Sequence, residues 1–250
     1  MRPALRRPSA TGPPGPDGTR SGANRARTPW RLAHFCVVDL ELSGLDPSHD
    51  EIISFAAVPI DAGRVVAGNA VYGLSASTRP LPEESVLVHG IRTVDLADAP
   101  PLDEAVGPLV DLMAGRILVA HAAWIERSFL APVLRRRGTR LRRPILDTRE
   151  LGHLLALEQG VPSQASDLGG LARSLGLPVH RPHHALGDAL TTAQVFIALA
   201  TLLEGYGHQT VRSLAQAGRR IRTLSVYPSG GSPPAPVRPA ATVRRHPPVT

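Results

Sequence analysis

Residues 37–45 read Val-Val-Asp-Leu-Glu-Leu-Ser-Gly-Leu, and the rest of the chain is interpreted around this stretch. The apolar run from Phe35 to Val38 predicts a buried strand. Because strand side chains alternate between faces, Asp39 and Glu41 are expected on one face, about 7 Å apart along the strand. Two carboxylates at a buried strand end favour a cation between them, and oxygen ligands suit Mg²⁺ or Mn²⁺. The alternative is a strand that runs out into a solvated acidic turn.

Charge is distributed unevenly along the 250 residues, which carry a net +7. Residues 1–33 carry seven Arg and one Asp, and residues 208–250 carry seven Arg and no acid. The middle, residues 34–207, holds 14 Arg against 20 acids. We therefore expect an acidic domain over 34–207 between two basic, Pro- and Gly-rich disordered tails. Basic tails attract polyanions without sequence preference, and the alternative is that they are simply solvated ends.

Apolar runs and cysteine content bear on location. The N-terminal residues lack the run of about seven apolar residues that a secretory signal needs. No apolar stretch approaches the roughly 18 residues needed to cross a bilayer. The single Cys36 excludes an internal disulfide and is typical of a reducing compartment. We expect a cytoplasmic protein without membrane contact.

Apolar patterning predicts alternating strands and helices across the middle of the chain. After the first strand, further strands are predicted over residues 51–60, 64–74, 117–120 and 144–146. Helices are predicted over residues 82–88, 102–113, 122–137, 148–157, 167–175 (capped by Ser166) and 185–203. The first three strands are joined by short connections, which indicates an antiparallel meander. A meander followed by β-α units predicts an α/β fold with a mixed sheet flanked by helices.

Three further polar residues fit a site built around Asp39 and Glu41. Glu126 lies in a mostly apolar helical segment, although a surface Glu paired with an Arg is the alternative. Asp188 enters the last predicted helix, where the helix dipole alone would favour an acid. His183 precedes it by five residues, and is otherwise an ordinary surface imidazole. Together the four acids and the histidine fit two-metal phosphodiester hydrolysis with a histidine base.

Motifs of the same residues carry a family resemblance. Residues 39–45 follow the pattern Asp-x-Glu-Thr-(Thr/Ser)-Gly-Leu, and residues 183–193 match His-x-Ala-Leu-x-Asp-Ala-x-x-Thr-Ala at every fixed position. Residues 88–91 read Val-His-Gly-Ile, and residues 147–148 read Asp-Thr. In these motifs, residues 34–205 resemble the DnaQ-like (DEDDh) 3′–5′ exonucleases, the family of the proofreading epsilon subunit of bacterial DNA polymerase III. The resemblance implies a ribonuclease H-like fold, a five-stranded mixed sheet flanked by helices.

The second motif departs from the family pattern His-Asn-Ala-x-Phe-Asp-x-x-Phe-Leu. Residues 121–130 read His-Ala-Ala-Trp-Ile-Glu-Arg-Ser-Phe-Leu. Ala122 replaces the Asn and donates no side-chain hydrogen bond, whereas Glu126 keeps the charge of the Asp and adds one methylene. Because a misplacement of about 1 Å can cost about 10²-fold in rate, this change bears on activity. We interpret the site as altered but working.

The resemblance also implies the role of each site residue. Two divalent cations, Mg²⁺ or Mn²⁺, would be held by Asp39, Glu41, Glu126 and Asp188. Asp39 would bridge both ions, Glu126 would act on the second ion through water, and His183 would be the general base. The substrate-binding residues implied beside the terminal nucleotide are Leu42, Ser43, Gly44, Leu45 and His89.

The predicted function is therefore a metal-dependent 3′–5′ exonuclease that acts on the 3′ ends of single-stranded DNA. An exoribonuclease of the same fold is one alternative, because nothing in the motifs distinguishes the 2′-hydroxyl group. A weakly active or non-catalytic module that binds 3′ ends is the other, because of Ala122 and Glu126. A DNA polymerase subunit is a candidate partner, with residues 208–224 as a candidate docking segment.

Overall fold

The computed structural model describes residues 27–141, 144–163 and 167–224. Its centre is a mixed sheet in the order β3-β2-β1-β5-β6, with β4 also paired to β2. The strands are β1 (Phe35–Leu42), β2 (Ile52–Asp61), β3 (Arg64–Val65), β4 (Val71–Leu74), β5 (Ile117–Ala120) and β6 (Leu146–Asp147). β2 is antiparallel to β1, β3 and β4, whereas β5 is parallel to β1 and β6 is parallel to β5. The predicted mixed sheet, including its antiparallel start, is confirmed.

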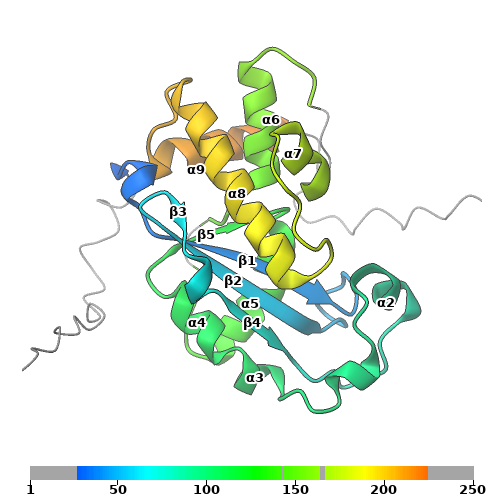
Figure 1. Ribbon diagram of the computed structural model, residues 1–250. Helices are drawn as coiled ribbons and strands as arrows, with labels where there is room; N and C mark the ends of the chain where they lie inside the picture. Colours follow the sequence, from blue (N-terminus) through cyan, green and yellow to red (C-terminus); the bar gives the residue numbers. More distant parts are fainter. Residues whose placement is uncertain (1–26, 142–143, 164–166, 225–250) are drawn as a thin grey trace, which may run out of the picture.

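Helices cover both faces of this sheet (Figure 1). Their bounds are α2 (Glu83–His89), α3 (Leu102–Ala105), α4 (Gly107–Met113), α5 (Trp124–Arg136), α6 (Thr148–Glu158), α7 (Leu168–Ser174), α8 (Ala185–Glu204) and α9 (Val211–Leu224). α8 crosses one face with α6, α7 and α9 beyond it, and α3, α4 and α5 lie on the opposite side. The predicted α/β fold with flanking helices is confirmed.

Alternation along β1 builds the two halves of the core. Phe35 and Val37 face α8, where the ring of Phe35 lies 4.7 Å from that of Phe196. Cys36 and Val38 face the opposite way, toward the helices that follow β4. Because both faces of the strand are covered, its apolar run is continuous rather than alternating. The same alternation carries Asp39 and Glu41 onto the α8 side at the strand end.

Two predicted elements are divided in the structure. The strand predicted over residues 64–74 breaks into β3 and β4 around the short 3-10 turn Ala67–Asn69, because Gly68 and Asn69 are poor strand formers. The sheet therefore has six strands and not five. The helix predicted over residues 102–113 breaks at Val106, because Pro108 lacks an N–H and disfavours helical geometry before it.

Beyond the predicted domain boundaries, residues 33 and 207, the structure places further described residues in the core. Trp30 is fully buried and packs edge-on against Phe196, and its backbone N–H donates to the carbonyl of Gln209 at 3.0 Å. α9 packs on α6, and it buries apolar side chains in the same core: Val211, Leu214, Ala217 and Ile221. The apolar residues of α9 recur at helical spacing, but they lie in a basic segment. The composition of that segment led to the prediction of a tail. The remaining tail residues lie outside the described residues.

The predicted Ser166 cap also lies outside the described residues. Asp167 caps α7 by accepting a hydrogen bond from the Gly170 N–H at 2.7 Å.

α8 corrects one further expectation. By length and composition, this 20-residue helix is apolar enough to span a membrane, the one such helix within the described ranges. More than half of it is buried against the sheet and neighbouring helices, so its apolar surface forms core.

Candidate active site

Three acidic side chains meet at the carboxyl end of β1. Oxygen atoms of Asp39, Glu41 and Asp188 all lie within 4.8 Å of one another. β1 supplies the first two, which confirms that they share a face, and the first turns of α8 supply the third. Glu41 is buried, and the other two are half-buried. Carboxylates at this spacing repel each other unless protons or a cation neutralise them.

Glu126 approaches the cluster from α5, on the other side of the sheet. Its side chain is buried, and its Oε2 atom has no hydrogen-bond partner among the described residues. The charge of Glu126 contributes to the raised pKa of Asp39, but Glu126 lies outside the group of three acids whose oxygens are within 4.8 Å of one another. A buried carboxylate oxygen without a donor costs free energy, so this position calls for a proton or a cation.

The ionisation of the cluster follows from its burial. Burial is the main cause that raises the pKa of Asp39 well above its ordinary value, with contributions from Glu126, Glu41 and Asp188. Burial and then the charge of Asp188 raise the pKa of Glu41 to about 7. The pKa values of Asp188 and Glu126 are raised by burial as well. Strongly raised pKa values that several groups share are typical of functional sites.

His183 lies beside the cluster on a tightly anchored loop. Its backbone N–H donates to Asp188 Oδ2 at 2.9 Å, and its φ angle is +57°. The loop passes so close to α8 that a Cβ atom on Gly187 would come within 2.5 Å of the carbonyl oxygens of His180 and Arg181. The side chain of His183 is exposed, as a base that must reach substrate requires.

Two other histidines surround His183. The ring of His184 stacks on Tyr72 of β4, with centroids 4.9 Å apart and an interplanar angle of 14°. His89, at the end of α2, accepts from the Ile91 N–H through Nδ1. Burial lowers the pKa of His89, and the charge of His183 lowers it further, so these two rings are near each other.

The predicted substrate-binding residues at the end of β1 and in the loop after it differ in their exposure to solvent. Leu42 is buried in the core and Leu45 is exposed. Ser43 is buried, and its hydroxyl donates to Asp50 at 3.0 Å and accepts from the Glu51 N–H at 2.9 Å. A Cβ atom on Gly44 would clash with the carboxylate of Asp50, which explains the glycine. Ser43 therefore shapes the loop, and its contact with substrate stays a prediction.

Asp147 is the residue whose role the sequence did not indicate. One carboxylate oxygen accepts from the N–H groups of Ala122 and Arg149 at 3.1 and 2.9 Å, and the other accepts from Ala123 at 2.9 Å. This buried side chain therefore caps α6 and also holds the segment that leads into α5 and Glu126. Its position at a strand end before a helix is the signal that could have identified it.

Comparisons with known proteins agree with this fold. The mixed sheet flanked by helices and the acid cluster at the end of β1 agree with the ribonuclease H-like exonuclease fold that the motifs predict. Residues 36–196 match the model of the RNase_T family, described as "Exonuclease". The chain belongs to this exonuclease family, as the motifs predict.

Curated relatives that the chain resembles are longer. It is 34% identical over 207 residues to a "DNA polymerase III subunit epsilon-like protein" of Rhodobacter capsulatus, covering 80% of this chain and 29% of the relative. It is 31% identical over 176 residues to "DNA polymerase III PolC-type" of Thermotoga maritima, covering 70% of this chain and 12% of the relative. The chain thus spans less than a third of the length of either protein.

Solved structures share the fold at lower identity. A structure described as "Exonuclease X in complex with 5′ overhanging duplex DNA" aligns with a TM-score of 0.57 at 22% identity, covering 74% of this chain and 99% of that one. The nuclease domain of 3′hExo, "a DEDDh family member, bound to rAMP", aligns with a TM-score of 0.57 at 17% identity, covering 72% and 95%.

Proposed function

We propose that this protein is a metal-dependent 3′–5′ exonuclease that shortens single-stranded DNA from its 3′ end. The observation that carries the proposal is the meeting of Asp39, Glu41 and Asp188 within 4.8 Å, beside His183 and the buried Glu126. Family membership supports the hydrolysis of nucleic acid ends. The 3′–5′ direction is inferred from the family alone.

The residues present fit divalent cations. The donor set is entirely carboxylate oxygen, which Mg²⁺ and Mn²⁺ prefer. The unpartnered Glu126 Oε2 and the raised pKa values of Asp39 and Glu41 indicate charge that a cation would neutralise. We infer that Asp39, Glu41 and Asp188 hold the ions, with Glu126 completing the set. When bound, such ions polarise the phosphoryl oxygen and activate the attacking water.

The protein groups supply orientation and proton transfer. The exposed imidazole of His183 accepts the proton of the attacking water as the general base. The Asp188–His183 hydrogen bond fixes the loop that carries this base. Residues 43–45 follow directly after β1, in a loop that Asp50 holds through the Ser43 hydroxyl and the Asp46 N–H, and their backbone is proposed to border the terminal nucleotide.

DNA is proposed as the substrate because both relatives described above are named as DNA polymerase III proteins. By the same argument, a polymerase is the proposed protein partner. RNA remains the alternative substrate, since the 3′hExo domain of the same fold is bound to rAMP.

The test compares 3′- and 5′-labelled single-stranded DNA and RNA of identical sequence, each with Mg²⁺, Mn²⁺ or chelator. Stepwise shortening from the 3′ end that requires a divalent cation is expected, with faster turnover of DNA. Asp188→Ala should abolish shortening and keep the parent circular dichroism spectrum, whereas Glu84→Ala, an exposed acid on α2, should leave the rate unchanged. Retained binding to 3′ ends without shortening would instead identify a non-catalytic binding module.

A further inference from the structure

The outward surface of α9 is cationic, whereas the packing of α9 on the core depends on its apolar inward side. Its inward side buries Val211, Leu214, Ala217 and Ile221 against the core. The exposed side presents Arg212, Gln216, Arg219, Arg220 and Thr223. The helix contains no acid, and the sequence contains none after Glu204. We call Arg212, Arg219 and Arg220 the α9 arginine face.

The arginines of this face are without charge partners in the part of the chain that the structure describes. No hydrogen bond or ion pair to a described residue is made by the side chains of Arg212, Arg219 or Arg220. Elsewhere, arginines such as Arg116 and Arg136 are paired with Asp61 and Asp103. Like charges on one helix face destabilise that helix, so an unpaired cationic face indicates a partner outside the molecule.

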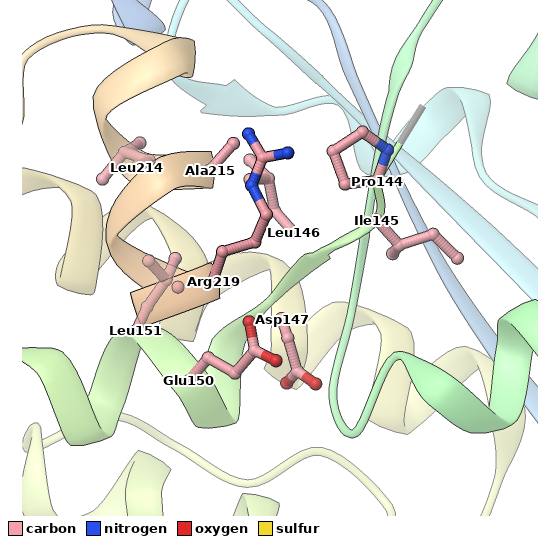
Figure 2. Close-up of a pocket in the computed structure, with 10 residues that line it drawn as sticks. Pro144, Ile145, Leu146, Asp147, Glu150, Leu151, Leu214, Ala215 and Arg219 are labelled. Atoms are coloured by element: carbon pink, nitrogen blue, oxygen red, sulfur yellow. The ribbon is translucent and has the colours of Figure 1, made fainter. Parts of the chain in front are cut away.

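The position of α9 connects this face with the active site. A small pocket between β6, α6 and α9 is lined by Pro144, Leu146, Asp147, Glu150 and Arg219 (Figure 2). Figure 2 shows the guanidinium group of Arg219 directed away from the carboxylates of Glu150 and Asp147. β6 is the edge strand of the sheet, and Asp147 at its carboxyl end holds the segment that carries Glu126. Arg219 of the α9 arginine face therefore lies beside the edge strand whose last residue, Asp147, holds the segment that leads into α5 and Glu126.

Electrostatics favours a nucleic acid as the occupant. A site built from four acids repels a polyanion, and residues 34–207 carry a net −6. Binding a strand therefore requires positive charge outside the site, and phosphate contacts by arginine supply it without reading sequence. We propose that the α9 arginine face binds the phosphate backbone of the strand whose 3′ end enters the active site. This inference rests on the function proposed above for the identity of its partner.

The test measures binding by fluorescence anisotropy in chelator, where no cleavage occurs. Single strands of about 4 and about 30 nucleotides are used, because single-strand site sizes in proteins run to roughly 16 nucleotides. The variant Arg212→Gln/Arg219→Gln is compared with Arg64→Gln/Arg173→Gln, which removes the same charge from exposed arginines of β3 and α7. Arg212→Lys/Arg219→Lys keeps both positive charges and tests whether strand binding depends on the guanidinium group or on charge alone.

We expect the α9 variant to lose affinity for the long strand relative to the short one, with the Lys variant and the β3/α7 control close to wild type. Each single-strand phosphate contact contributes about 0.7 to the slope of log affinity against log salt, so the slope should fall by about 1.4. Between roughly 50 and 200 mM salt, wild-type affinity should then drop about sevenfold more than that of the variant. Equal losses in the variant and the control, or an unchanged slope, would overturn the proposal and favour an acidic protein as occupant.

The cleavage assay separates failure of this inference from failure of the proposed function. Metal-dependent shortening together with unchanged strand binding by the α9 variant would support the exonuclease assignment. The same result would overturn only the proposal that the α9 arginine face binds the strand. Salt-sensitive binding through α9 without any shortening would support the α9 arginine face as a strand-binding surface and contradict the exonuclease assignment.

Discussion

At the residue scale, backbone strain marks the segment that differs from the family motif. Ala122 has a φ angle of +58°, a left-handed conformation that Asn and Gly adopt more easily than Ala. The family pattern has Asn at this position, so the substitution removes both a polar side chain and a favourable conformer. Two hydrogen bonds to Asp147, from the N–H groups of Ala122 and Ala123, hold this segment in place despite the strain. Sequence comparison located the change, but only the φ angle shows why it matters to the backbone.

Ala122→Asn should raise the free energy of unfolding by about 1 kcal/mol, because Asn tolerates the left-handed conformation better. Urea denaturation measures the effect. Ala62, which has a φ angle of +51° in the turn between β2 and β3, provides a matched control. Ala62→Asn should stabilise the protein by a similar amount and leave hydrolysis unchanged. A less stable Ala122→Asn protein would contradict the strain argument.

Glu41 should make the metal-free protein sensitive to pH. Its pKa is raised from an ordinary 4.5 to about 7 in the folded state. Between these values the folded protein holds the proton more tightly than the unfolded chain, so stability is full below pH 4.5 and is lost as pH rises through 7. The loss is about 3 kcal/mol in order of magnitude.

Thermal unfolding in chelator from pH 4 to pH 8 checks this expectation. Mg²⁺ or Mn²⁺ should restore stability at the upper end, because a ligand that binds only the folded state stabilises it. Glu41→Gln should reduce the loss of stability between pH 4 and pH 8, of which Asp39, Asp188 and Glu126 contribute the rest, while Glu84→Gln, at an exposed acid of α2, should keep the full loss. An unchanged profile in Glu41→Gln would show that the titrating group lies elsewhere.

At the scale of elements, the site depends on how close the His183 loop lies to α8. The loop carries two left-handed non-glycine residues, Arg181 and His183, and packs onto the backbone at Gly187. The motif match located His183 and Asp188 from sequence. That match left Gly187 as a variable position, because close backbone approach arises only when the loop and the helix are placed together.

Gly187→Ala should displace the His183 loop, since its Cβ atom would lie 2.5 Å from two backbone carbonyl oxygens. We expect hydrolysis to fall at least about 10²-fold, the scale for a misplacement of about 1 Å, with the affinity for divalent cation less affected. Single-turnover kinetics and calorimetric metal titration separate the two. Gly107→Ala, where a Cβ atom meets nothing within 4 Å, is the matched control and should keep the parent rate.

At the scale of the whole molecule, the two ends of the described chain close the core together. The segment before β1 forms a backbone bridge with the segment before α9 through Pro29 and Thr210. Trp30 fills the space between these segments and α8. Composition alone assigned both regions to the tails, because the contacts that bury them join residues about 180 positions apart.

Trp30→Ala should destabilise the protein by about 3–5 kcal/mol, the cost of removing a large buried aromatic side chain. Leu32→Ala, two residues away and 68% exposed, should change stability by less than about 0.5 kcal/mol. Chemical denaturation of both variants measures the difference. Equal, small effects would mean that residues before β1 do not belong to the folded domain.

The sequence by itself determined the α/β class and the order of the main elements, and it supplied the four acids and the histidine as candidates for the site. Strand alternation and motif spacing are local properties, so they can be read from neighbouring residues. Only the tertiary structure decided that Glu126 is buried on the opposite side of the sheet from α8, that Asp147 anchors the second motif, and that α9 belongs to the core. These outcomes depend on contacts between distant segments, whose closeness is set by the packing of the whole chain around one sheet.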